Sequence, residues 1–260
     1  MKYALAIGFC LLAATPALGA ESAKPDCAMA ATHSLHASLP VMASAIRRGE
    51  DVVIVAIGSS STAGSGASDA GHSYPAQLTH ELQRRWPALA VTVLNKGVGG
   101  ETAPQMVARF ERDVIAHNPD LVIWQTGTNS LLRGESVESY AAVLRAGIAT
   151  LKQAHADVIL MDPQYAPKVL ASSAHVRVIE TMRAAARELK VGLFPRFAAM
   201  KSWVDGGRYA MSDLISPDSL HLNDTSYRCI ARSLAAGIAQ AVRAAPVPMA
   251  VNTRAEAGLR

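Results

Sequence analysis

The amino-acid sequence predicts an α/β domain in which helices cover both faces of a five-stranded, mainly parallel sheet. Five short apolar runs alternate with longer segments of helical period between residues 51 and 243, and such runs are typical of parallel strands that are buried on both faces. The chain has 260 residues, of which 50% are hydrophobic, enough for one domain with a substantial core. We therefore expect a doubly wound, three-layer α/β/α sandwich whose ligand cleft lies beyond the carboxyl ends of the strands.

The expected strands are short, and each is followed by polar residues, glycine or proline that end or redirect the chain. They lie at residues 51–57, 91–94, 121–124, 158–161 and 191–194. Parallel strands present their carboxyl ends at one edge of a sheet, so the loops that follow these runs are where functional side chains are expected.

The segments between the strands carry apolar residues at the spacing of a helix. One helix is expected after Pro104, where Met106, Phe110 and Val114 recur every four residues. Asn223 can cap the last helix at its start. Further helices are expected over the apolar stripes at residues 137–151, 176–189 and 227–238, and over residues 34–47. We assign all of these stripes to the hydrophobic core.

The first twenty residues have the order of an export signal, with Lys2 followed by an apolar run and then small residues. A buried N-terminal helix is the alternative, and the apolar run is too short to span a bilayer. The expected division is a signal peptide at 1–20, an N-terminal extension at 21–50, one α/β domain at 51–245 and a flexible tail at 246–260. The mature protein is therefore expected in the periplasm or outside the cell.

Charge and cysteine content narrow the possible partners. The net charge of +4 falls to 4 − 1 = +3 without Lys2, and the basic residues are scattered, which argues against a nucleic-acid groove. No later stretch of the mature chain has the length and composition of a membrane span. Removal of the signal leaves Cys27 and Cys229, which in an oxidising compartment either form one disulfide or leave Cys229 as a buried thiol. The cysteine and histidine spacings indicate no metal site.

Four polar segments follow expected strands or precede the last helix. Small residues at 58–64 allow a tight turn that exposes a hydroxyl, and the glycine-rich bend at 95–102 can point backbone N–H groups at an anion. Asn129 follows the third strand, and Asp218 lies three residues before His221, where its carboxylate can orient the imidazole. Taken singly, each segment is also consistent with a structural turn or a locally hydrogen-bonded histidine.

In their order and their placement at successive strand ends, the four segments resemble four sequence blocks of the SGNH hydrolases, also called the GDSL lipase and esterase superfamily. The resemblance implies the flavodoxin-like fold of that superfamily. It implies that Ser60 is the nucleophile and that Asp218 and His221 complete a catalytic triad. It also implies an oxyanion hole formed by the N–H groups of Ser60 and Gly100 and the side chain of Asn129.

One position departs from the family pattern. Where the family has Gly-Asp-Ser, this chain has Gly58-Ser59-Ser60, and Ser61 follows. Because Ser60 is the second residue after Gly58, as in the family motif, it is the expected nucleophile. Ser59 then takes the place of a residue that supports the turn.

The resemblance implies hydrolysis of a carboxylic ester through an acyl-enzyme on Ser60, with no metal or organic cofactor. Export argues against acyl-CoA substrates, so the favoured substrate is a short acyl ester, such as an acetyl ester, on an extracytoplasmic glycan. The alternatives are a broad-specificity lipase or lysophospholipase-like esterase, an O-acyltransferase that uses the same triad, and a non-catalytic glycan-binding member of the fold. Retention of all five site residues argues against a non-catalytic glycan-binding protein. The sequence implies no particular oligomeric state.

Overall fold

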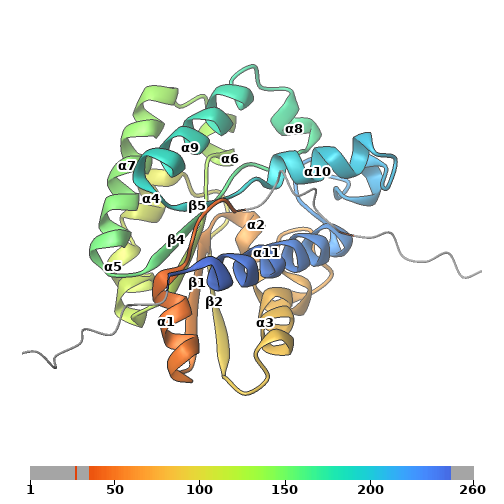
Figure 1. Ribbon diagram of the computed structural model, residues 1–260. Helices are drawn as coiled ribbons and strands as arrows, with labels where there is room; N and C mark the ends of the chain where they lie inside the picture. Colours follow the sequence, from red (N-terminus) through yellow and green to blue (C-terminus); the bar gives the residue numbers. More distant parts are fainter. Residues whose placement is uncertain (1–26, 28–34, 247–260) are drawn as a thin grey trace, which may run out of the picture.

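The computed structural model describes Cys27 and residues 35–246 of the chain (Figure 1). Five parallel strands form one sheet in the order β2-β1-β3-β4-β5, which confirms the predicted fold class. The strands are β1 Val52–Gly58, β2 Val91–Gly97, β3 Leu121–Gln125, β4 Asp157–Met161 and β5 Gly192–Phe194. The signal peptide predicted at 1–20 and, apart from residue 246, the tail predicted at 246–260 lie outside the described residues.

The register of the sheet brings the carboxyl ends of neighbouring strands level with one another. Gly58 at the end of β1 pairs with Gly97 at the end of β2, and Gln125 at the end of β3 pairs with Met161 at the end of β4. The segments that follow these four strands therefore begin at one edge of the sheet, as expected for a doubly wound fold.

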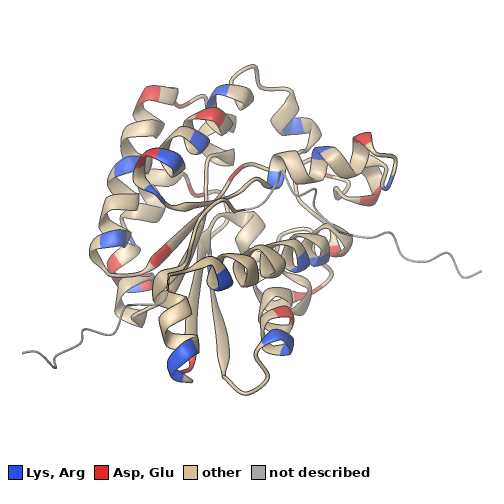
Figure 2. Ribbon diagram, viewed as in Figure 1, with Lys and Arg blue, Asp and Glu red and all other residues tan. Residues whose placement is uncertain are grey.

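Helices cover both faces of the sheet and complete the three layers (Figure 1). Helices α4, α5, α7 and α9 lie over one face, and α1, α3 and α11 lie over the other. Acidic and basic residues are interspersed along the helices of both faces (Figure 2). The helices are α1 Pro40–Arg48, α2 Ser60–Ala63, η2 Ala70–His72, α3 Tyr74–Arg85, α4 Ala103–Val107, α5 Phe110–Asp113, η3 Ile115–His117, α6 Thr128–Leu132, α7 Val137–Gln153, α8 Pro167–Leu170, α9 His175–Leu189, α10 Arg196–Asp205, η4 Met211–Asp213 and α11 Asp224–Ala244. In the described part of the chain, no helix has both the length and the apolar character needed to cross a lipid bilayer.

The structure corrects the prediction of one continuous helix after Pro104. That segment forms three short pieces, α4, α5 and η3, because the backbone leaves the helical conformation at Arg109, with φ −113° and ψ 9°. Its guanidinium group is buried at the strand ends. The N-terminal helix begins at Pro40 and not at residue 34. Proline is well suited to the first turn of a helix, because the N–H group that it lacks would have no hydrogen-bond acceptor within the helix.

The described residues of the N-terminal extension are attached to the rest of the fold at several points. A disulfide joins Cys27 to Cys229 on α11. The N–H group of Leu193 in β5 donates to the carbonyl oxygen of Leu35 at 3.4 Å, so the extension lies along the edge strand of the sheet. Helix α1 then packs against β1, β4 and α11.

Candidate active site

A tight turn between β1 and α2 places Ser60 at the edge of the sheet. Two glycines make the turn possible. A Cβ atom at Gly58 would lie 2.1 Å from Thr62 Oγ1, and a Cβ atom at Gly97 would lie 2.1 Å from the backbone nitrogen of Ala63. A larger residue at either position would therefore displace the turn. Ser60 is the first residue of α2, where a backbone N–H has no intrahelical acceptor.

The structure brings Ser60 together with His221 and Asp218 from the far end of the chain. Ser60 Oγ lies 2.8 Å from His221 Nε2, and His221 Nδ1 is hydrogen-bonded to Asp218 Oδ2. The other carboxylate oxygen of Asp218 accepts the N–H groups of Leu220 and His221, each at 2.9 Å. A single carboxylate thus shapes the turn before α11 and orients the imidazole ring.

Asp218 carries a carboxylate that is ionised at neutral pH. Partial burial raises its pKa, but hydrogen bonds from the His221 ring and from the N–H groups of His221 and Leu220 outweigh burial and lower the pKa to about 2. A carboxylate beside Nδ1 favours the tautomer with the proton on Nδ1, which leaves Nε2 free to accept the proton of Ser60.

The two serines beside Ser60 are buried. Ser59 is 2% exposed, and its hydroxyl donates to Gln125 Oε1 at 3.1 Å. Ser61 is 1% exposed, whereas Ser60 is partly exposed in the turn. Of the three consecutive serines, Ser60 alone has its hydroxyl hydrogen-bonded to a histidine ring.

Gly100 and Asn129, the other two expected site residues, are adjacent in space. The Asn129 side-chain amide donates to the carbonyl oxygen of Glu101 at 2.8 Å, so one of its two Nδ2 hydrogens remains for a ligand. Gly100 has φ +79°, a left-handed conformation that favours glycine. Among the described residues, the N–H groups of Gly100 and Ser60 have no hydrogen-bond acceptor. Three donors of the kind that stabilise an oxyanion are therefore present.

Two arginines that the sequence analysis did not identify fasten the loop after β2. Arg109 donates through Nη2 to backbone carbonyls near the ends of β1 and β2, at 3.2 and 2.8 Å. Its Nε donates to the carboxylate of Glu101 at 2.8 Å. Arg133 Nη2 donates to the carbonyl oxygen of Gly100 at 2.7 Å. For Arg109, the signal in the sequence was the presence of a charged residue inside the apolar stripe that begins at Met106.

Gln125, at the end of β3, supports the turn that carries Ser60, and the sequence analysis did not identify it either. Its Oε1 accepts three hydrogen bonds, from the N–H and the hydroxyl of Ser59 and from the hydroxyl of Thr62, at 3.0, 3.1 and 3.1 Å. Ser59 therefore does support the turn, through a partner on the adjacent strand. A polar residue directly after a fully apolar run was the available signal.

A second buried network supports the loop that carries His221. Gln164 Nε2 donates to the carbonyl oxygen of Leu220 at 3.1 Å. Gln164 Oε1 accepts the hydroxyl of Thr128 at 3.0 Å and Nη2 of Arg196 at 2.9 Å. Burial lowers the pKa of Arg196 to about 10. The network links the segments after β3, β4 and β5 to the residue that precedes His221.

At this edge Ser60, His221 and Asp218 have the geometry of a Ser-His-Asp triad, and the loop with Gly100 and Asn129 carries N–H groups that are available to a ligand. This arrangement on an α/β sheet defines the class of serine hydrolases. Within the described ranges, no group of three or more His, Cys, Asp or Glu residues is placed to hold a metal ion.

Comparison with known proteins gives the family. The chain belongs to the non-GDSL lipase-like family, whose model matches residues 26–244, and this confirms the resemblance to the SGNH hydrolase superfamily. It is 34% identical over 105 residues to an acetylxylan esterase of Geobacillus stearothermophilus, a match covering 36% of this chain and 48% of that protein. It is 29% identical over 107 residues to an arylesterase of Vibrio mimicus, covering 37% and 54%. These matches span about half the length of each relative.

Solved structures share the fold. A two-domain esterase active on acetylated mannans, crystallised with mannopentaose, superposes with a TM-score of 0.68 at 21% identity, over 82% of this chain and 58% of that one. The acetylxylan esterase Axe2 of Geobacillus stearothermophilus superposes with a TM-score of 0.63 at 24% identity, over 73% and 95%. At these identities the likeness extends to the fold alone.

Proposed function

We propose that the protein is an exported serine esterase that removes short acyl groups, acetyl foremost, from a glycan outside the cytoplasm. The observation that carries the proposal is the 2.8 Å contact between Ser60 Oγ and His221 Nε2, with Asp218 on the opposite side of the ring. A nucleophile, a base and an orienting carboxylate in this order are the groups that acyl transfer requires.

The reaction follows from the positions of these groups. His221 Nε2 takes the proton of Ser60 as Oγ attacks the ester carbonyl, and the tetrahedral oxyanion receives hydrogen bonds from the N–H groups of Ser60 and Gly100 and from Asn129. His221 then gives its proton to the departing alcohol. A water molecule, activated by the same imidazole, attacks the acyl-enzyme and releases the acid and Ser60.

The choice of substrate is supported by the relatives, which include an acetylxylan esterase and, in fold, an esterase active on acetylated mannans. In the proposal, residues 1–20 are a signal peptide and residues 51–245 are the catalytic domain, with the extension at 21–50 packed against it and a tail from 246. N-terminal sequencing of the exported protein tests this division. A mature N-terminus at residue 20 or 21 is expected, and an intact Met1 on the protein outside the cytoplasm would contradict it.

The test of activity compares acetate release from acetylated xylan and acetylated mannan with hydrolysis of p-nitrophenyl acetate, butyrate and octanoate. Wild-type protein should release acetate from at least one polysaccharide and should prefer acetate to octanoate. Ser60→Ala should lose activity by about 10³-fold or more. A preference for octanoate would indicate a lipase-like esterase.

Two further results would overturn hydrolysis itself. Inactivity on every ester would indicate a glycan-binding protein. If an added oligosaccharide became acetylated while little acetate was released, the enzyme would be an acyltransferase.

A further inference from the structure

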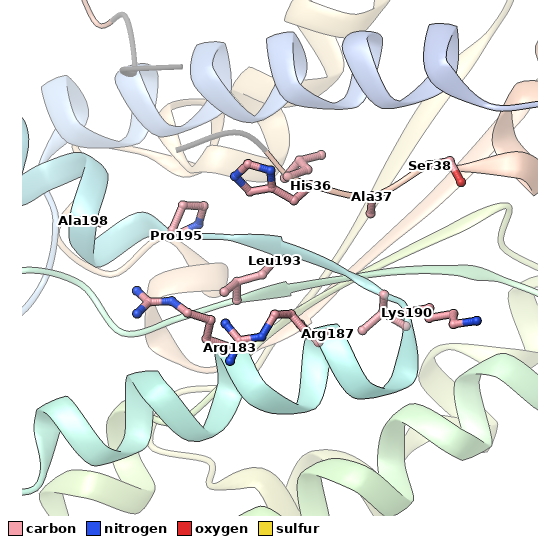
Figure 3. Close-up of a pocket in the computed structure, with 12 residues that line it drawn as sticks. His36, Ala37, Ser38, Arg183, Arg187, Lys190, Leu193, Pro195 and Ala198 are labelled. Carbon is pink, nitrogen blue, oxygen red and sulfur yellow. The ribbon is translucent and has the colours of Figure 1, made fainter. Parts of the chain in front are cut away.

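A cleft lies apart from the Ser60 turn, between the N-terminal extension and α9. It has a volume of about 740 Å³. Residues 35–38 form one wall, α9 forms the other, and Leu193 of β5 lies between them (Figure 3). Its volume falls in the range of about 300–1,000 Å³ that is typical of pockets for drug-sized ligands.

The lining of this cleft is basic. Arg183 and Arg187 lie one helical turn apart on α9 and, with Lys190 at the end of that helix, line the cleft (Figure 3). All three side chains are exposed, and no Asp or Glu residue is among those that line it. In the part of the chain that the structure describes, none of the three forms an ion pair with a carboxylate.

Other charged residues on the same helix are paired. Arg177 forms an ion pair with Glu138 at 2.7 Å, and Glu188 forms one with Arg145 at 2.9 Å, both on α7. The contrast places the excess positive charge of α9 on the side that faces the extension. Burial raises the pKa of the Asp162 carboxyl group and the charge of Arg183 opposes that rise, but Asp162 is not part of the lining of the cleft. A bound anion would reduce the repulsion among the three cations that line it.

The rest of the lining suits a ligand with an apolar face as well as negative charge. Leu193, Pro195 and Ala198 give the cleft an apolar surface beside the arginines. The edge of β5 is already occupied, because the N–H of Leu193 donates to the carbonyl oxygen of Leu35. A peptide therefore cannot add to the sheet as a further strand at this point.

The cleft also runs toward the catalytic edge of the sheet. Its lining extends from Lys190, just before β5, to Pro195 and Ala198, just after it. The carboxyl end of β5 lies at the same edge of the parallel sheet as the Ser60 turn. Strands β3 and β4 lie between β1 and β5, so only a polymer chain long enough to pass across the ends of these two strands would occupy the cleft and the catalytic edge together.

We infer that this cleft binds an acidic oligosaccharide, in which uronic acid carboxylates pair with Arg183, Arg187 and Lys190 and a sugar ring packs on Leu193. The choice of a sugar rests on the proposed function, and the negative charge rests on the lining of the cleft. A glycan held here would carry its acetylated units toward the catalytic edge. The cleft would then select acidic glycans among acetylated ones.

The test is isothermal titration of the Ser60→Ala protein, which binds without turnover. The probes are xylotetraose, the same oligosaccharide with one glucuronate branch, a tetraglutamate peptide and inorganic phosphate. The acidic oligosaccharide should bind about tenfold tighter or more than xylotetraose, the gain expected from one or two charge-assisted hydrogen bonds. The preference should decrease with added salt.

Charge reversal locates the site. Arg183→Glu combined with Arg187→Glu should abolish the preference, and so should the milder pair of glutamine substitutions if the reversed pair lowers stability. Arg84→Glu on α3 is the matched control, because α3 packs against β2 and α11 and not against α9, and it should leave the preference unchanged.

Three outcomes would overturn the inference: equal affinity for the neutral and acidic oligosaccharides, a preference that survives both double substitutions, or phosphate or tetraglutamate binding as tightly as the acidic sugar. Because binding is measured without turnover, this result is separate from the test of ester hydrolysis. A failure of either experiment leaves the other interpretable.

Discussion

Gln125 is expected to be as important for turnover as a residue that touches the substrate, although it lies behind Ser60, the proposed nucleophile. Substitution by leucine keeps the size of the side chain and removes the acceptor of three hydrogen bonds from Ser59 and Thr62. All three residues are buried, so the freed donors find no water. The Thr62 hydroxyl can still donate to Tyr74 Oη, 3.3 Å away, but the turn would have to move to satisfy the N–H and hydroxyl groups of Ser59.

The magnitude follows from the number of bonds. At about 0.5–1.5 kcal/mol net for each hydrogen bond, Gln125→Leu should lower the free energy of unfolding by roughly 2–4 kcal/mol. A displacement of Ser60 by about 1 Å from its position beside His221 is expected to reduce kcat by about 10²-fold. KM should change little, because Gln125 is buried behind the turn and does not contact the substrate.

The assay combines urea unfolding with hydrolysis of p-nitrophenyl acetate. Gln83→Leu is the matched control, because the Gln83 side chain also makes buried or half-buried backbone hydrogen bonds, to Val91 and Leu89 at the amino-terminal end of β2. It should cost stability and leave kcat unchanged. The reasoning is refuted if Gln125→Leu loses stability and keeps wild-type kcat, or if both substitutions lower kcat equally.

Two further predictions concern the oxyanion donors and pH. Asn129→Ala should lower kcat on p-nitrophenyl acetate by about 10²–10³-fold, and a variant within threefold of wild type would show that Asn129 does not contact the oxyanion. Burial raises the pKa of Asp162 to about 7 in the folded protein, against about 3.9 for an unfolded chain. Between these values the native state binds more protons than the unfolded state, so stability should fall as pH rises from about 4 to 7. Asp162→Asn, which keeps the acceptor for the Phe197 N–H, should flatten this slope in urea unfolding at pH 5 and pH 7.5, and an unchanged slope would contradict the assignment.

The strands and the order of the site segments were predictable because their signals are local. An apolar run followed by glycine or a polar residue marks the end of a buried strand wherever it occurs, and parallel topology then places those ends together. Asp218 and His221 are three residues apart, so their pairing required no knowledge of the fold. The placement of Ser60 against His221 spans 161 positions, and the family resemblance supplied it.

The residues that support the site were not predictable in the same way. Gln125 and Arg109 matter because of partners on other strands and loops, and the sequence does not specify which carbonyl or hydroxyl a buried side chain will meet. Helices α3 and α10 were also not predicted, for two different reasons. The apolar residues of α10 are distributed around the helix, so they form no stripe. Helix α3 does carry a stripe in Tyr74, Leu78 and Leu82, which the sequence analysis did not use.

Ser59 illustrates what the family motif alone predicts and what it leaves open. The motif predicts an aspartate at this position, and its replacement by serine raised the question of register. In the structure, Ser59 donates a hydrogen bond to Gln125 Oε1 and Ser61 is buried. Both observations support the proposal that Ser60 is the nucleophile.

Covalent labelling tests the central claim most directly, because it identifies the attacking atom without a choice of substrate. Wild-type protein, Ser59→Ala, Ser60→Ala and Ser61→Ala are each treated with a fluorophosphonate, and the modified peptide is sequenced by mass spectrometry. We expect one adduct on Ser60 in the wild type and in the Ser59 and Ser61 variants, and none in Ser60→Ala. An adduct on Ser59 or Ser61, or a wild-type protein that remains unlabelled, would contradict the account of the site.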